Sequence, residues 1–268
     1  TGKAQLEKLL SGDFKDKATV HFFLGQIEEE AKNLDSALAH YQQVSAGEQY
    51  VPARARAAQI LAGKGRLDEA RQLVRDTVGR TPAEKIQLVL AEAHLLRESK
   101  RIDDAFALLN ATLHANPDDL DLLYDSALIA ERLGKFDILE ARLRRLLEIK
   151  PDHAHGLNAL GYSFADRNIR LAEAYELIAK ASALAPNDPF IMDSLGWVLF
   201  RQGKIDDALK TLERAYGLKS DPEIAAHLGE VLWNVNRKED ARRILVEAAR
   251  KNPENEVLGQ AVKKFAQP

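Results

Sequence analysis

The chain has no cysteine, few aromatic residues and almost balanced charge. Without cysteine, disulfide bonds, zinc-thiolate sites and cysteine nucleophiles are excluded. Aromatic residues make up only 6% of the chain, and the apolar residues are mostly alanine and leucine, which favour helix. The net charge of -3 gives no general field that would attract nucleic acid or an anionic membrane. We therefore expect an all-α protein that does not bind nucleic acid.

Long hydrophobic runs are also absent. No apolar stretch approaches the roughly 18 residues that a membrane-spanning helix needs. The sequence begins Thr1-Gly2, with neither an initiator methionine nor a signal peptide. We expect a fragment without direct membrane contact, whose missing upstream part could carry a signal or a lipid anchor.

An internal repeat is the strongest pattern that is present. An alanine followed four residues later by an apolar residue recurs about every 34 residues, with Leu139 in one gap, at Ala37, Ala70, Ala105, Ala174, Ala208 and Ala241. A small residue precedes each of these positions by about twelve residues, at Gly25, Ala58, Ala93, Ala127, Gly161, Gly196 and Gly229. A proline often follows, at Pro82, Pro117, Pro151, Pro186 and Pro253. Each unit therefore predicts a helix, a polar turn and a second helix.

The residue types at these positions have a physical reason. A small residue on the first helix and an alanine on the second let the two backbones approach closely. Leucines such as Leu195, Leu199 and Leu212 would fill the space around that contact. The proline cannot continue the second helix, so it ends one unit and leads into the next.

This pattern resembles the tetratricopeptide repeat, a helical hairpin of about 34 residues. The resemblance implies a right-handed superhelical solenoid of about seven repeats with a C-terminal capping helix. Arg54, Leu139 and one extra residue in the turn at 167–170 depart from the pattern. The expected segments are the second helix of a truncated upstream repeat at 1–17, repeats at 18–50, 51–85, 86–119, 120–153, 154–188, 189–221 and 222–255, and a cap at 256–268.

The same resemblance implies that the first helices line a concave binding face, because the other helix surfaces pack against neighbouring repeats. Aromatic side chains on such a face offer a large contact area for a peptide or a partner helix. The alternative for Trp197 and Trp233 is packing between repeats. We expect Asp193, Trp197 and Phe200 to remain free to meet a partner. The candidate partner-binding residues are Tyr124, Asn158, Tyr162, Asp193, Trp197, Phe200, His227, Glu230 and Trp233.

Catalytic and metal-binding patterns are weak. Asp193, Ser194 and His227 contain the residue types of a triad, but adjacent residues on one helix point in different directions. His153 and His155 are better explained as a loop and a helix start than as metal ligands. We predict no catalytic residue, no metal site and no cofactor.

One subclass of the repeat family holds a C-terminal carboxylate with Lys and Asn at inward positions. The corresponding places here hold Tyr124, Asn158 and Asp193. That set does not form a carboxylate clamp. An aromatic and partly acidic groove predicts apolar or basic ligand segments instead.

A narrower resemblance rests on GYSFADR at 161–167, DSLGWV at 193–198 and EIAAHLGEVLW at 223–233. These stretches are similar to proteobacterial outer-membrane lipoproteins with tetratricopeptide repeats. The resemblance implies a non-enzymatic adaptor that binds a periplasmic carboxyl-terminal processing protease and delivers cell-wall hydrolases to it. It also implies the periplasmic face of the outer membrane; the alternative is the cytoplasm. A generic peptide-binding scaffold, or a regulatory domain of an enzyme whose catalytic part is absent here, remain as alternatives.

Overall fold

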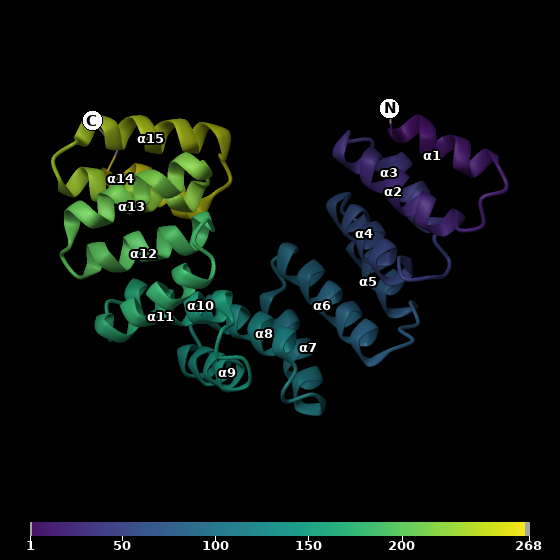
Figure 1. The fold of residues 1–268 in the computed structure, drawn as a ribbon, viewed down its shortest axis with the longest axis horizontal. Coiled ribbons are helices and arrows are strands. Elements are labelled where there is room, and N and C mark those ends of the chain that lie inside the picture. Colours follow the sequence, from purple (N-terminus) through teal and green to yellow (C-terminus); the bar gives the residue numbers. More distant parts are fainter. Residues whose placement is uncertain (1, 266–268) are drawn as a thin grey trace. The chain divides into compact units, whose positions relative to one another are not determined.

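The computed structural model describes residues 2–265, which form sixteen α-helices and no strand. The all-α prediction is confirmed, and the helices follow one another as hairpins (Figure 1). Thr1 and residues 266–268, which belong to the predicted segments 1–17 and 256–268, lie outside the described residues.

The helices divide into two compact units, one up to Lys135 and one from Phe136. Unit 1 contains α1 (Gly2–Ser11), α2 (Lys17–Glu30), α3 (Leu34–Gln42), α4 (Tyr50–Gly63), α5 (Leu67–Arg75), α6 (Pro82–Glu98), α7 (Ile102–Ala115) and α8 (Leu120–Arg132). Unit 2 contains α9 (Phe136–Ile149), α10 (Ala154–Asp166), α11 (Leu171–Leu184), α12 (Pro189–Arg201), α13 (Ile205–Leu218), α14 (Pro222–Asn234), α15 (Lys238–Lys251) and α16 (Glu256–Phe265).

In unit 2, each first helix packs on the second helix of its own hairpin and on a neighbouring first helix. In unit 2 the hairpins are α10 with α11, α12 with α13, and α14 with α15. Among the first helices, α12 contacts both α10 and α14, while α16 covers α14 and α15. The first helices of unit 2 therefore form one continuous row.

The first helices start where the sequence supplies an N-cap. Asp119, Asp188 and Asp221 each accept a backbone N–H of the first turn, as does Nδ1 of His153. Thr81 forms a capping box with Glu84. These caps satisfy amides that have no partner inside the helix.

The prediction that a small residue lies where paired helices approach closely is confirmed at two glycines. A Cβ on Gly196 would lie 2.6 Å from Cγ of Leu212, and one on Gly161 would lie 2.9 Å from the carbonyl oxygen of Ala174. Such distances are too short for a larger side chain, so these glycines set the spacing of α10 against α11 and of α12 against α13.

The hairpin turns need a residue in the left-handed region. Gly65, Gly134 and Gly203 fill this position with φ of 78°, 67° and 79°. The longer turn before α11 has two such residues, Asn168 at 57° and Arg170 at 49°. The turn thus accommodates its extra residue by placing a second residue in the left-handed backbone conformation.

None of the helices in the described part of the chain has both the length and the apolar character that crossing a bilayer requires.

Candidate functional site

The site is built on the row of first helices in unit 2. Five of the predicted residues meet there: Tyr162 on α10, Asp193, Trp197 and Phe200 on α12, and His227 on α14. We call this set the first-helix face of unit 2. It joins three successive hairpins.

The centre of this face is a pair formed by His227 and Asp193. Nδ1 of His227 lies 3.0 Å and 2.9 Å from the two carboxylate oxygens of Asp193. The two side chains are only 12% and 8% exposed. The ring N–H therefore donates to a carboxylate that water barely reaches, which strengthens the bond.

Burial and charge act on His227 in opposite directions. Burial disfavours the charged ring and lowers its pKa, but the negative charge and hydrogen bond of Asp193, with smaller contributions from Asp166 and Glu223, outweigh it. The pKa of His227 is therefore raised above its ordinary value of 6.5. A protonated His227 would stabilise the contact between α12 and α14.

Aromatic rings enclose the pair. The Trp197 ring stacks on His227, with ring centroids 4.3 Å apart and planes at 19°. The hydroxyl oxygen of Tyr162 lies 3.4 Å from Nε2 of His227, and the Phe200 ring lies 5.4 Å from that of Trp197. The imidazole is therefore held on several sides.

The His227–Asp193 pair has no serine hydroxyl among residues 2–265 in position to act as the nucleophile of a catalytic triad. The hydroxyl of Ser194 donates to the carbonyl oxygen of Phe190, one turn earlier on its own helix, at 3.1 Å. Nε2 of His227 faces the Tyr162 hydroxyl instead. The arrangement therefore fixes the orientation of side chains between repeats and does not form a triad.

The expectation that Asp193 and Trp197 are free to meet a partner is corrected. Asp193 is 6% exposed and Trp197 is 5% exposed, because the ion pair and the stacking contact enclose them. Phe200, Tyr162 and His227 remain half-buried. The His227 side chain is itself only 12% exposed, so the accessible part of the face comes mainly from Tyr162 and Phe200, while a binding role for all five residues stays a prediction.

Two predicted residues lie against the C-terminal helix. The Trp233 ring is 6.1 Å from that of Phe265, and a carboxylate oxygen of Glu230 is 3.5 Å from Nζ of Lys264. Both partners belong to α16, so Trp233 packs against the C-terminal cap, a contact that differs from the packing between repeats that the sequence left open.

Two further predicted residues are placed separately. Tyr124 lies half-buried on α8 of unit 1. Asn158 lies on α10, one turn before Tyr162, and its Oδ1 is enclosed without a hydrogen-bonding partner in the described part of the chain. Nε1 of Trp197 is also enclosed without a partner within residues 2–265. Such buried polar atoms are costly unless something bonds to them.

Sequence reasoning did not identify the pairing of Asp193 with His227. The two residues are 34 positions apart, which is one repeat, so they occupy equivalent places on adjacent first helices. An acidic residue and a histidine one period apart on first helices were therefore the sequence pattern that could have predicted this pair.

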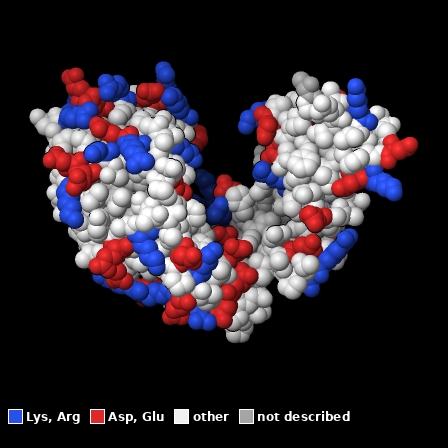
Figure 2. Space-filling view, viewed as in Figure 1, with Lys and Arg blue, Asp and Glu red and all other residues white. Residues whose placement is uncertain are grey.

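Within the described residues 2–265, charged side chains form no single-sign patch on the face that Figure 2 shows, and no metal site is present. Basic and acidic residues are interspersed on each unit in the face that Figure 2 shows. Across residues 2–265, no three His, Asp or Glu side chains come together in a way that could hold a metal ion.

Comparison with protein families gives three matches to tetratricopeptide repeat models, at residues 51–76, 90–137 and 199–264. A TPR repeat-containing protein of Pseudomonas aeruginosa is 42% identical over 210 residues, which is 78% of this chain and 36% of the relative. Mouse tetratricopeptide repeat protein 21A is 24% identical, over 66% of this chain and 15% of its own length. The chain thus spans about a third or less of the curated relatives it matches.

Solved structures share the fold. A tetratricopeptide repeat protein from Parabacteroides merdae superposes with a TM-score of 0.69 at 16% identity, over 94% of this chain and all of the other. A thermophilic TPR protein from Thermus thermophilus gives 0.60 at 23% identity, over 67% of this chain and 97% of the other. At these identities the likeness concerns the fold alone.

Proposed function

We propose that this chain, which belongs to the tetratricopeptide repeat superfamily, is a non-enzymatic scaffold that binds a protein partner on the first-helix face of unit 2. One observation carries the proposal. Tyr162, Trp197, Phe200 and His227 come from three successive hairpins and pack into one aromatic cluster, in which Tyr162 and Phe200 are half-buried and lie over the buried Trp197 and His227 side chains. A rigid aromatic surface of this kind supplies the anchors that dominate binding at protein interfaces.

Preorganisation supports the same function. The Asp193–His227 pair and the stacked Trp197 hold the surface rings in place before a partner arrives. Less conformational freedom then has to be lost on binding, which raises affinity.

The finer proposal is that the partner is a periplasmic carboxyl-terminal processing protease. It is supported by the resemblance of residues 161–167, 193–198 and 223–233 to lipoprotein adaptors. In this role the chain brings the protease and cell-wall hydrolases together at the periplasmic face of the outer membrane, where the whole protein is anchored. Its contribution is effective concentration, since it performs no chemistry.

The experiment has two arms. The immobilised chain is incubated with a bacterial envelope extract, and the retained proteins are identified by mass spectrometry. A purified processing protease is then given a purified cell-wall hydrolase with and without the chain.

The adaptor proposal expects recovery of the protease and faster loss of the hydrolase when the chain is present. Retention of other envelope proteins without the protease would contradict the adaptor role and leave a scaffold for a different partner. No specific retention at all would contradict the scaffold proposal itself.

A further inference from the structure

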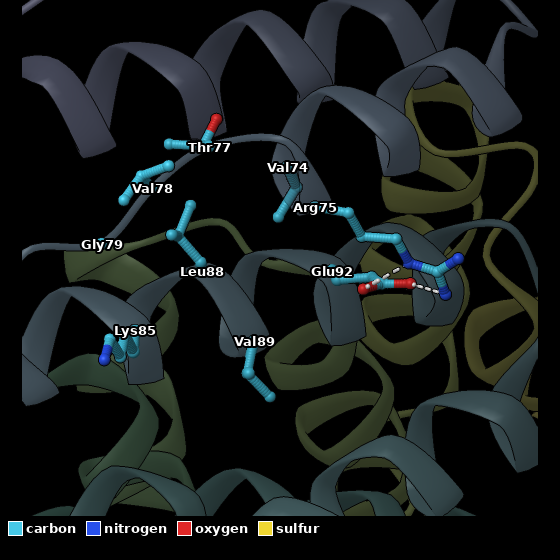
Figure 3. A pocket seen from close by; sticks show the side chains of 9 residues that line it. All are labelled: Val74, Arg75, Thr77, Val78, Gly79, Lys85, Leu88, Val89 and Glu92. Carbon is cyan, nitrogen blue, oxygen red and sulfur yellow. Dashed lines mark hydrogen bonds and ion pairs between the residues drawn. The ribbon is translucent and has the colours of Figure 1, made fainter.

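Unit 1 contains a pocket at the connection between α5 and α6. Its volume is about 340 Å³, and Figure 3 shows the nine side chains around it. The lining residues are Val74, Arg75, Thr77, Val78, Gly79, Lys85, Leu88, Val89 and Glu92. All of them belong to unit 1, so the pocket is independent of the first-helix face of unit 2.

The pocket exists because α5 is short. It has 9 residues, whereas α7, α11, α13 and α15 have 14 each. The second helix is therefore about 7 Å shorter, and the connection that follows it lies beside α6 in its place. Leu88 and Val89 of α6 therefore line an opening.

A comparison within the same unit shows what normally fills such a space. The helix α3 also has 9 residues, but Val44 in the segment after it is fully buried. After α5 the corresponding segment places Thr77 inward, and its hydroxyl donates to the carbonyl oxygen of Leu73. Thr77 is buried at the place equivalent to Val44, but Val78 is 70% exposed and does not fill the opening.

The floor of the pocket is apolar and its two ends are cationic. In Figure 3, Val74, Leu88 and Val89 lie between Lys85 at one end and the Arg75–Glu92 pair at the other. The Glu92 carboxylate is nearly buried and already receives hydrogen bonds from both Arg71 and Arg75. Two guanidinium groups on one carboxylate leave a net positive charge at that end.

The other end carries a cation available to a ligand. Lys85 is exposed, and within residues 2–265 its ammonium group makes no hydrogen bond or ion pair. An aliphatic side chain placed on the floor would therefore have positive charge on both sides.

We propose that this pocket is a second docking site, which takes an aliphatic side chain of a partner segment with acidic residues on either side of it. The aliphatic group lies on Val89 and the exposed Val78, next to the buried Leu88, and the flanking carboxylates pair with Lys85 and Arg75. A basic partner segment would meet the same cations unfavourably.

The test uses the whole chain with ¹³C-labelled methyl groups and two short capped peptides, one with Glu-Leu-Glu and one with Lys-Leu-Lys at its centre. We expect saturable shifts of the Val74, Val78, Leu88 and Val89 methyl signals with the Glu-Leu-Glu peptide, at a Kd of about 1 mM or tighter. The Lys-Leu-Lys peptide should bind about tenfold more weakly.

The variant is Lys85→Glu, and its matched control is Lys15→Glu, an exposed lysine on the α1–α2 connection. Lys85→Glu should weaken the Glu-Leu-Glu peptide about fivefold or more, while Lys15→Glu should leave it unchanged. An unchanged two-dimensional methyl spectrum outside the pocket would confirm that both variants fold.

Three results would overturn the proposal: no saturable shift at these methyls up to about 5 mM peptide, equal binding of the two peptides, or equal binding by Lys85→Glu and wild type. Because the readout is confined to unit 1 and to short peptides, each of these results would leave the protease-binding proposal untouched. Conversely, if the chain did not bind the protease, the pocket would still be expected to prefer the Glu-Leu-Glu peptide.

Discussion

At the scale of single residues, the Asp193–His227 pair is the feature with the clearest consequence. It lies between two adjacent first helices, and both side chains are largely shielded from water. A carboxylate and an imidazolium in this setting depend strongly on each other, since loss of one leaves the other buried without a counter-charge.

The pair predicts a dependence of stability on pH. The pKa of His227 is raised in the folded state, so its contribution is fully present below about 6.5, the ordinary histidine value, and is lost as pH rises through the raised pKa. The urea midpoint, followed by circular dichroism, should therefore fall between about pH 6 and pH 9.

Asp193→Asn provides the control for that prediction. Without the carboxylate, burial dominates and favours the neutral ring, so the decrease with pH should disappear or reverse. A wild-type midpoint that stays constant over this range, or an equal decrease in the variant, would show that the pair is not coupled as described.

The hairpin turns give a second prediction at this scale. Gly65 and Lys100 occupy equivalent turn positions, with φ of 78° and 60°. A side chain in this region costs roughly 1 kcal/mol, and a Cβ on Gly65 would contact nothing within 4 Å. Gly65→Ala should therefore lower the free energy of unfolding by about 1 kcal/mol, and Lys100→Gly should raise it slightly. Thermal melts of the two variants would test this, and shifts of the same sign would contradict it.

At the scale of helices, the contact between α10 and α11 depends on Gly161. A Cβ there would lie 2.7 Å from Cγ1 of Ile178 and 2.9 Å from the carbonyl oxygen of Ala174. Because one of these atoms belongs to the backbone and the other to a β-branched side chain, neither can move easily.

Gly161→Ala should therefore destabilise the protein by about 1 to 3 kcal/mol, despite the better helix propensity of alanine. Gly217→Ala is the matched control, because a Cβ at Gly217 meets nothing within 4 Å. That variant should be neutral or slightly stabilising. Equal melting temperatures for the two variants would mean that the close approach of α10 and α11 is not under strain.

The helices themselves were predictable from sequence because one period of about 34 residues fixes the small residue, the turn and the helix end together. The early end of α5 was not predicted. Whether a chain continues as helix past Arg75 depends on what the next side chains pack against, and Val78 and Thr77 have no distinct helical pattern of their own. The pocket at α6 follows from that tertiary outcome.

The site was predictable in its location and less so in its detail. Register placed Tyr162, Trp197 and His227 on first helices, since inward positions repeat with the period. Register could not show that Trp197 stacks on His227, because side-chain orientation across two repeats depends on the distance between their helices. The repeat register also could not predict the contact of Trp233, because its neighbour Phe265 comes from the final helix and not from a repeat.

At the scale of the whole molecule, the chain provides two candidate binding surfaces of different chemistry. The first-helix face of unit 2 is aromatic, while the α5–α6 pocket of unit 1 is aliphatic with cationic ends. Two sites on one chain suit a scaffold that holds two proteins at once, because the second binding event then occurs at high effective concentration.

The most direct test of the central claim is the affinity of a purified carboxyl-terminal processing protease for the immobilised chain, measured by surface plasmon resonance. The compared variants are Tyr162→Ala combined with Phe200→Ala, and Tyr175→Ala as a control on the second helix of the same hairpin as Tyr162. Trp197 is left intact because it is 5% exposed and its removal would disturb the packing.

We expect the double variant to bind at least about thirtyfold more weakly, which corresponds to roughly 2 kcal/mol lost at an interface anchor, with unchanged helicity. Tyr175→Ala should bind like wild type. Absence of wild-type binding, or equal affinity of the double variant and wild type, would contradict the claim that the first-helix face of unit 2 binds the protease.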